Sequence, residues 1–421
     1  MKNQNSLHPL CPLREALPDT KWLQSFRRKL LAWYEKHARE LPWRGTVDPY
    51  KVWVSEIMLQ QTTTAAVEGY YYRFLERFPD VQSLATASEA DVLRYWEGLG
   101  YYRRATQLYR AAQVIVSAHG GTFPNIFDDV LSLPGIGRYT AGAICSIAYH
   151  QRRPILEANT IRLHARLLAY PDDPTKAAGN KLLWQMAELV LPKQSVIPRS
   201  QTATHTLCSR LPLYGQMNQA LMELGSLICA PKSPDCAKCP VVSLCRTAQQ
   251  GLQHVIPALK TEKNFEERTE VALVIKKHGK YLMMHYPQGV RWAGLWDFPR
   301  CELNHDVQQP DFFDYCINIK HLTGYQVVLH DQLAEFRHVV TRFKITLKVF
   351  AAETVGRKNR AKYQTEWVTA KNLDDLALNT TGRKIAGMEA EGCKSLFKNH
   401  LAENVKGTLM THETDRADQH R

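Results

Sequence analysis

Apolar side chains recur at intervals of three and four residues through the first half of the chain. The first such stretch contains Trp22, Phe26, Leu30, Trp33 and Tyr34, which is the spacing of an amphipathic helix. Similar stretches, separated by glycine and proline, predict further helices at 52–59, 70–78, 90–96, 105–119, 127–133, 139–149, 161–170 and 181–191. The chain from residue 21 to about residue 228 is therefore predicted to be helical.

The apolar period changes in the second half of the chain. β-Branched and aromatic residues gather at 270–276, 281–286, 343–352 and 366–368, as they do in strands. These segments predict an α+β domain at 270–400, joined to the helical part by a linker at 251–269. We expect a polar, proline-broken surface loop at 195–215 and flexible tails at 1–20 and 401–421.

Length and charge narrow the function. The chain has 421 residues, which predicts two domains, and a formal net charge of +13 at pH 7, which indicates an anionic partner such as nucleic acid. No apolar run approaches the roughly 18–20 residues of a membrane helix, and the N-terminus has no apolar segment of the secretory kind. We expect a cytoplasmic, nucleoid-associated monomer that does not bind membranes, whose cysteines are metal ligands or buried thiols.

Four cysteines within a proline-rich stretch form the strongest local signal. They are Cys229, Cys236, Cys239 and Cys245. Four thiolates can hold either tetrahedral zinc or a [4Fe–4S] cluster. Only one C-x2-C pair is present, whereas zinc ribbons more often have two, so the pattern favours the cluster. Four unrelated buried thiols are the alternative, which the density of cysteines disfavours.

Two glycine-containing turns are candidates for DNA contact. Gly135 and Gly137 lie between two predicted helices, where exposed N–H groups at a helix start could bind a phosphate. The alternative is a plain turn between helices. The second turn, 98–104, places Tyr101 and Tyr102 beside two arginines, which suits stacking on nucleic acid. A buried tyrosine pair with solvated arginines is the alternative there.

Two glutamates have apolar neighbours. Burial of Glu56 would raise its pKa and make a general acid, although the periodicity alone favours an exposed glutamate on a half-buried helix. Glu157 precedes a predicted helix, so it could simply cap that helix. Two carboxylates flanking one sugar could cleave an N-glycosidic bond, but spacing leaves open whether these two meet. Gln60 and Gln61 could fill the gap left by an extruded base.

Together these motifs resemble the MutY-type adenine DNA glycosylases, of the helix–hairpin–helix superfamily that includes endonuclease III. The resemblance covers about residues 22–400 and is dense at 41–44, 50–62, 96–102, 133–143 and the cysteine stretch. It implies an all-α helix–hairpin–helix glycosylase domain at 21–250 and a Nudix-like α+β lesion-recognition domain at 270–400. The implied activity is removal of adenine mispaired with 8-oxoguanine or guanine in double-stranded DNA, a step of base-excision repair.

The resemblance also implies a role for each matching residue. Glu56 would protonate adenine N7, with Glu157 as the second carboxylate and with Tyr139 and Asn159 in support. The residues implied to line the adenine pocket are Arg39, Trp43, Leu59 and Gln219. Those implied to contact DNA are Gln60, Gln61, Tyr101, Gly135, Gly137, His338, Thr341 and Arg342. The four cysteines match the ligands of a structural, DNA-sensing [4Fe–4S] cluster.

The chain departs from the family pattern at two sites. Glu157 and Ala158 stand where the family usually has Asp and Gly, and Val340-Thr341-Arg342 aligns with a Phe-Ser-His loop. The second domain also lacks a glutamate-rich Nudix box, so we expect no nucleotide hydrolysis.

The pattern of lysines indicates which reaction to expect. Strand-cutting relatives carry a lysine nucleophile where this chain has Tyr139, and no lysine occurs between Lys51 and Lys176. We therefore expect a monofunctional enzyme that leaves an abasic site. The alternatives are an Fe–S protein that binds lesions with its catalysis attenuated by Glu157, and a strand-cutting pyrimidine glycosylase like endonuclease III.

Overall fold

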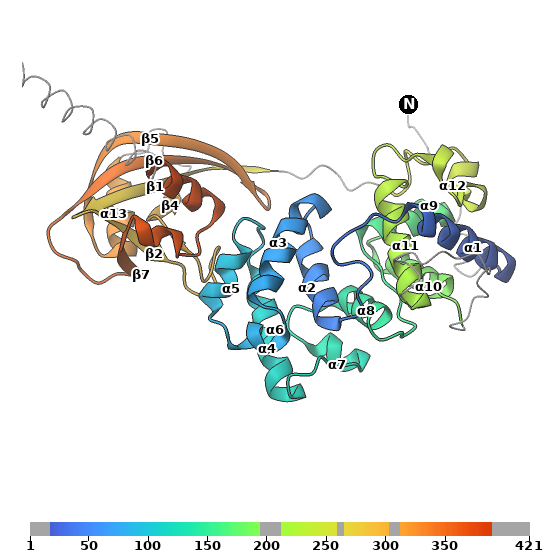
Figure 1. Ribbon diagram of the computed structural model, residues 1–421. Coiled ribbons are helices and arrows are strands. Elements are labelled where there is room, and N and C mark those ends of the chain that lie inside the picture. The colour runs from blue at the N-terminus through green and yellow to red at the C-terminus, as the bar shows by residue number, and fades with distance from the viewer. Residues whose placement is uncertain (1–16, 194–211, 259–264, 303–311, 390–421) are drawn as a thin grey trace, which may run out of the picture. The chain divides into compact units, whose positions relative to one another are not determined.

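The computed structural model describes residues 17–193, 212–258, 265–302 and 312–389. They divide into two compact units (Figure 1). The helical unit is Met1–Ala87 with Thr106–Glu262, and the sheet unit is Ser88–Ala105 with Lys263–Arg421. The tails predicted at 1–20 and 401–421 lie mostly or wholly outside the described residues, as does most of the loop predicted at 195–215.

The helices predicted from the apolar spacing are confirmed. Those of the helical unit are α1 (Thr20–His37), α2 (Pro49–Leu59), α3 (Thr64–Arg77), α4 (Val81–Thr86), α6 (Arg103–His119, whose first residues belong to the sheet unit), α7 (Phe127–Ser132), α8 (Arg138–Ile147), α9 (Ala158–Leu168), α10 (Ala177–Val190), α11 (Leu213–Leu227) and α12 (Arg246–Gln249). Short 3-10 turns η2 (Cys236–Lys238) and η3 (Val242–Leu244) lie in the cysteine stretch. The predicted loop ends earlier than expected, because α11 begins at Leu213 with Pro212 as its N-cap.

The apolar stripes of α1, α9, α10 and α11 form one core. Phe26, Leu163, Met186 and Leu221 are buried in it. Helix α2 differs, because every residue from Val52 to Met58 is buried. A helix that is apolar on all sides is enclosed by its neighbours, so a polar side chain on it is removed from water.

The sheet unit contains a seven-stranded sheet. Its strands are β1 (Glu266–Lys277), β2 (Lys280–His285), β3 (Trp296–Asp297), β4 (Arg300–Glu302), β5 (Gln326–Val340), β6 (Phe343–Val355) and β7 (Gln364–Thr369). The order is β3-β2-β1-β6-β5, with β4 on β1 and β7 on β2. The parallel pair β1–β6 and the antiparallel hairpin β5–β6 run side by side (Figure 1). The unit also holds α5 (Glu89–Trp96), α13 (Phe312–Thr323), η4 (Lys371–Asp374) and a helical segment at 380–389.

Both faces of the sheet are covered. Val271, Leu273 and Ile275 of β1 pack in one buried cluster, whereas the alternate residues Ala272 and Val274 pack in another. The period of two confirms the predicted α+β architecture. Strand β1 starts at Glu266, four residues before the predicted strand, because 266–269 pair with β6. Among the described helices, none is long and apolar enough to cross a membrane.

Candidate active site

Glu56 lies in the enclosed part of α2 and is 5% exposed. The Tyr139 hydroxyl, on the first turn of α8, donates to Glu56 Oε2 at 2.7 Å. Burial raises the pKa of Glu56 to about 7, with the negative charge of Glu157 adding to the rise and the Tyr139 hydrogen bond and Arg44 opposing it. Such a carboxyl can hold or release a proton at neutral pH.

Glu157 caps the start of α9. Its carboxylate accepts from the Asn159 backbone N–H at 2.9 Å, the Thr160 N–H at 3.0 Å and Asn159 Nδ2 at 3.2 Å. Burial raises the pKa of Glu157, and these hydrogen bonds together with Arg162 oppose the rise. Since its charge also affects Glu56, the two carboxyls are close enough to interact.

A buried carboxylate on α11 brings two arginines together. Arg39 donates to Glu223 Oε2 at 2.7 Å and Arg44 donates to the same oxygen at 2.6 Å. Burial alone would raise the pKa of Glu223, but the hydrogen bonds from Arg39 and Arg44 hold it at about 2. One turn before Glu223, the buried Gln219 accepts a hydrogen bond from Tyr34 at 2.8 Å. The structure thus brings Arg39 and Gln219 to one cluster.

The two other residues predicted for the adenine pocket lie at or near α2. Trp43 is buried and packs edge-on against Tyr71 at 5.5 Å. Leu59 is half-buried at the last position of α2. At the next two positions, Gln60 donates to Thr140 Oγ1 at 3.3 Å, whereas Gln61 is exposed with a left-handed φ of 57°.

The glycine hairpin between α7 and α8 packs closely on α6. Gly135 has a φ of 76°, and a Cβ there would lie 2.6 Å from the Cβ of Gln107. Gly137 is the N-cap of α8, and no side chain caps this helix end. The first N–H groups of α8, the helix that also carries Tyr139, can therefore donate hydrogen bonds to an anionic partner.

The four clustered cysteines are free thiols that line one cavity. Arg166 of α9 also lines it and donates to Cys229 Sγ at 3.3 Å. In the described part of the chain, no three His, Cys, Asp or Glu side chains converge closely enough to hold a single metal ion. Arg162, which donates to Asn159 Oδ1 at 2.9 Å, also donates to the Cys229 carbonyl at 2.7 Å, so α9 connects the carboxylate site with the cysteine loop.

The remaining predicted DNA-contact residues belong to the sheet unit. Tyr101 is 51% exposed with a φ of 49°, and Thr341 has a φ of 54° in the β5–β6 turn. Arg342 forms an ion pair with Glu266 at 3.0 Å. His338 is half-buried on β5, where burial first and nearby arginines second lower its pKa.

Comparisons with known proteins agree with this arrangement. Residues 54–188 match the family model of the HhH-GPD superfamily base excision DNA repair protein, and residues 270–387 match the NUDIX domain. The adenine DNA glycosylase of Rattus norvegicus is 32% identical over 419 residues, which is 86% of this chain and 77% of that protein. The chain belongs to the adenine DNA glycosylase family.

The chain is also similar to a bacterial protein and to a solved structure. The adenine DNA glycosylase of Buchnera aphidicola is 31% identical over 367 residues, covering 86% of this chain and 97% of that protein. Among solved structures, a thermostable thymine-DNA glycosylase aligns with 55% of this chain and 98% of its own, at 26% identity and a TM-score of 0.46. The predicted resemblance to MutY-type adenine DNA glycosylases is confirmed, and the chain is a base-excision repair glycosylase that binds DNA.

Two expectations for the family's carboxylates can now be compared with the structure. The periodicity of 52–62 favoured an exposed Glu56, and this was wrong because neighbouring helices enclose α2 on all sides. For Glu157, the capping alternative is confirmed, since its side chain forms a capping box with Thr160. Glu157 therefore caps α9 and also raises the pKa of Glu56 through its charge.

Glu223 is the main site residue that the sequence analysis missed. Its signal was present, because Glu223 is a lone carboxylate in an apolar helix, as Glu56 is, and lies one turn after Gln219. Arg44 and Arg162 were also missed. Arg44 pairs with Glu223 and Arg162 bonds the Cys229 carbonyl, and both partners lie far along the chain, so no local pattern identifies these contacts.

Proposed function

We propose that this chain hydrolyses the N-glycosidic bond of adenine in duplex DNA when adenine lies opposite 8-oxoguanine or guanine. The observation that carries the proposal is the carboxyl of Glu56, which is buried, hydrogen-bonded by Tyr139, close to Glu157 and has a pKa of about 7. Near neutral pH a large fraction of this group is protonated, as a general acid requires.

The reaction uses the two carboxyls in different ways. Glu56 transfers its proton to N7 of an extruded adenine, and the bond between C1′ and N9 breaks with its electron pair leaving on the base. The positive charge that develops on the sugar lies near the anionic Glu157. Water adds to C1′, and its proton returns to the Glu56 carboxylate. Tyr139 occupies Oε2 of Glu56, so the proton to be transferred is carried by Oε1.

The cluster around Glu223 forms the polar wall of the proposed adenine pocket. Glu223 remains ionised, and its ion pairs hold Arg39 and Arg44 in position. Tyr34 donates to Oε1 of Gln219, which leaves the amide nitrogen as the Gln219 group that can donate to a base. Trp43 and Leu59 supply apolar surface.

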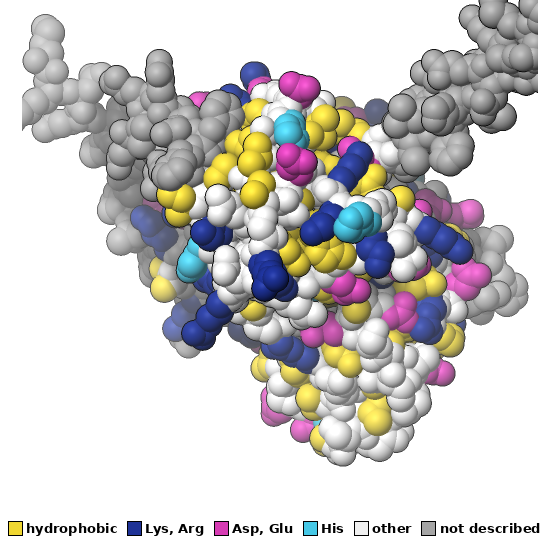
Figure 2. Space-filling view, turned by 90° about the vertical axis from the view of Figure 1, so that its left-hand side faces the viewer, with side chains coloured by type: hydrophobic (Ala, Val, Ile, Leu, Met, Phe, Trp, Pro, Cys, Tyr) yellow, Lys and Arg dark blue, Asp and Glu magenta, His cyan; other side chains and the backbone are white. Residues whose placement is uncertain are grey.

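DNA contacts are assigned to turns rather than to overall charge. Figure 2 shows Lys and Arg side chains spread across the face turned to the viewer, among hydrophobic and acidic ones. The hairpin at Gly135 and Gly137 presents backbone N–H groups to a phosphate, which positions the duplex without reading its sequence. Gln60, Gln61 and Tyr101 intrude at the lesion pair. In the sheet unit, His338, Thr341 and Arg342 contact the strand that carries 8-oxoguanine.

The proposed enzyme is monofunctional. Strand cutting needs an amine that attacks the sugar and forms a Schiff base. At the position of that lysine this chain has Tyr139, whose hydroxyl donates to Glu56. An abasic site is therefore the product.

We further propose that the four clustered cysteines hold a [4Fe–4S] cluster. Four thiols lining one cavity are a suitable donor set for such a cluster. When bound, the cluster would fix the loop structurally. Arg166 donates to Cys229 Sγ and to the carbonyls of Ala230 and Pro231, so it orders this loop from α9. Absorption of visible light by the purified protein tests the assignment, since a zinc protein is colourless.

A second candidate function is lesion binding with attenuated catalysis. The observation in its favour is that both oxygens of Glu157 are engaged by the first turn of α9. Glu157→Asp restores the carboxylate length usual for the family. A large gain in adenine release would support this candidate, whereas a loss or a small change would favour the enzyme as proposed.

The direct test is single-turnover release of free adenine from duplexes containing A opposite 8-oxoguanine, G or T. We expect release from the first two and its loss in Glu56→Gln, which keeps the side-chain shape but cannot donate a proton from a carboxyl. A wild-type protein that binds the duplex without releasing adenine would refute the activity. Trapping of a covalent protein–DNA adduct by borohydride would refute the monofunctional assignment.

A further inference from the structure

Residues 88–105 lie within the stretch that matches the glycosylase family model, yet they pack with the sheet. Helix α5 ends at Trp96, and Glu97 follows as its C-cap. This packing within the sheet unit is close, because a Cβ added to Gly294, before β3, would lie 2.9 Å from Leu93 Cδ1. A short part of the glycosylase sequence is thus held by the C-terminal part of the chain.

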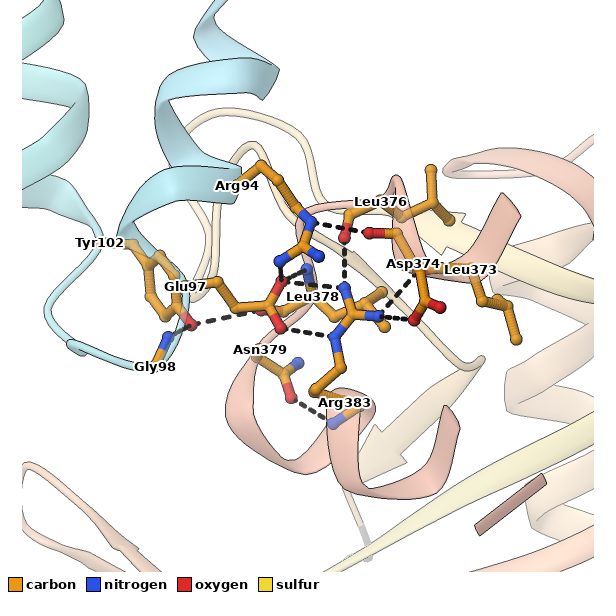
Figure 3. Close-up of polar contacts among 11 residues, drawn as sticks. Arg94, Glu97, Gly98, Tyr102, Leu373, Asp374, Leu376, Leu378, Asn379 and Arg383 are labelled. Atoms are coloured by element: carbon orange, nitrogen blue, oxygen red, sulfur yellow. Dashed lines mark hydrogen bonds and ion pairs between the residues drawn. The ribbon is translucent and has the colours of Figure 1, made fainter. Parts of the chain in front are cut away.

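The carboxylate of Glu97 is the centre of this contact (Figure 3). Its side chain is 8% exposed, and Arg383 donates to it through two nitrogens, at 2.5 Å from Nε and 3.0 Å from Nη2. The Leu378 backbone N–H donates to the same carboxylate at 3.1 Å. Arg383 is itself fixed by Asp374 at 3.1 Å and by the Leu376 carbonyl at 2.7 Å. The pair therefore has bidentate geometry and little freedom to move.

A tyrosine hydroxyl attaches the following turn to the same segment. Tyr102 donates to the Leu378 carbonyl at 3.2 Å and accepts from the Gly98 N–H at 3.2 Å, as Figure 3 shows. Between these anchors, Gly98, Gly100 and Tyr101 all have positive φ, of 92°, 76° and 49°. Tyr101 is the non-glycine member, and such a conformation persists only where its surroundings impose it.

We propose that Arg383 is a positioning residue for DNA: by holding Glu97, it fixes the turn that presents Tyr101 to the lesion pair. The inference rests on the proposed function, which assigns Tyr101 to DNA contact. Arg383 itself touches neither Tyr101 nor the carboxylate site through any contact in the described residues. When Arg383 is removed, Glu97 keeps the Leu378 N–H and the longer contact from Arg94 as donors. Trp96 and Arg104 still hold the Gly100 carbonyl, so we expect the start of the turn to loosen and Tyr101 to leave its present conformation for part of the time.

The test is a double-mutant cycle on DNA affinity. The duplex carries 2′-fluoroadenosine opposite 8-oxoguanine, because fluorine at C2′ disfavours the sugar cation and prevents cleavage. Because a base that stacks on one aromatic side chain adds measurably to DNA affinity, we expect Tyr101→Ala to weaken binding about tenfold. Arg383→Gln should weaken it to a similar extent, and the double variant by no more than about twofold further. Lys280→Gln, an exposed cation of β2, is the control for loss of one positive charge.

Independent effects would overturn the proposal. If Arg383→Gln and Tyr101→Ala multiply to about a hundredfold loss, Arg383 does not act through Tyr101. The same holds if Arg383→Gln behaves like Lys280→Gln. If thermal melting shows that Arg383→Gln fails to fold, Glu97→Gln replaces it in the cycle, because this variant leaves the other partners of Arg383 in place. The proposal is then judged by the same comparison with Tyr101→Ala and Lys280→Gln. Because the duplex is not cleaved, a wild-type protein that releases no adenine would refute the proposed activity and leave this cycle valid.

Discussion

Removal of the Tyr139 hydroxyl tests the electrostatics of the site most directly. In Tyr139→Phe, Glu56 loses the 2.7 Å hydrogen bond that opposes the effect of burial on its pKa. A hydrogen bond to a charged group contributes about 1.5–3 kcal/mol, which corresponds to roughly one to two pKa units. The pKa of Glu56, about 7 in the wild type, should therefore rise to about 8–9 in the variant.

The sign of the effect on activity follows from the role of Glu56. The protonated carboxyl is the active form, so adenine release declines as pH rises through its pKa. In Tyr139→Phe the decline should occur at higher pH, even if the rate at low pH falls because the carboxyl is held less firmly. This separation of midpoint from maximal rate distinguishes an electrostatic effect from simple damage to the site.

The assay is single-turnover adenine release between about pH 5 and pH 10, with binding saturated at each pH. Tyr149→Phe is the matched control, since its hydroxyl donates to the Phe123 carbonyl at 2.8 Å and contacts neither carboxyl. The control should keep the wild-type midpoint. A midpoint for Tyr139→Phe that is unchanged, or that moves to lower pH, would show that Tyr139 does not set the protonation of Glu56.

Three further variants test the charges and the backbone near the site. Because the pKa of Glu56 is raised to about 7, the free energy of unfolding of the wild type falls as pH rises from 4.5 to about 7. Glu56→Gln lacks this loss. Between pH 4 and pH 8 its free energy of unfolding, measured by urea denaturation, should therefore rise by up to about 3 kcal/mol relative to the wild type. Glu223→Gln should destabilise the protein at pH 7 by about 3 kcal/mol, because it removes the buried charge that pairs with the half-buried Arg39 and Arg44. Since the pKa of Glu223 is lowered to about 2, that difference should shrink as the pH falls below 4.5 in the same assay, and a constant difference would contradict the ion pairing. Gly135→Ala should lower the melting temperature and DNA affinity through about 1–3 kcal/mol of strain against Gln107, whereas Gly137→Ala, with nothing within 4 Å, should not.

Regular burial explains which elements the sequence predicted. Helices with one apolar stripe and strands such as β1, buried on alternate sides, carry periods that can be read directly. Strand β5 does not, because it is an edge strand whose residues are mostly exposed and whose apolar positions are interrupted by charged ones. Its partner β6 alternates more clearly and was predicted.

Long-range pairing explains which site residues the sequence did not predict. The hydrogen bond between Arg383 and Glu97 spans 286 positions, and that between Arg39 and Glu223 spans 184. No local period carries information about such pairs. The resemblance to the family identified single residues by their motifs, but it gave no information on the pairs Arg383–Glu97 and Arg39–Glu223.

The assignment of different roles to the two carboxyls depends on their hydrogen-bond donors. Glu56 accepts from one hydroxyl in an enclosed helix, so burial dominates and favours its protonated form. Glu157 is also buried, but two backbone N–H groups and an amide oppose the effect of burial on its pKa, at a helix start that favours negative charge. Two carboxyls with such different hydrogen-bond donors can serve as acid and anion in one reaction. Glu157 is one methylene longer than the Asp usual for the family, but α9 itself holds its carboxylate. The capping hydrogen bonds therefore do more than stabilise the helix, because they also keep the negative charge in place.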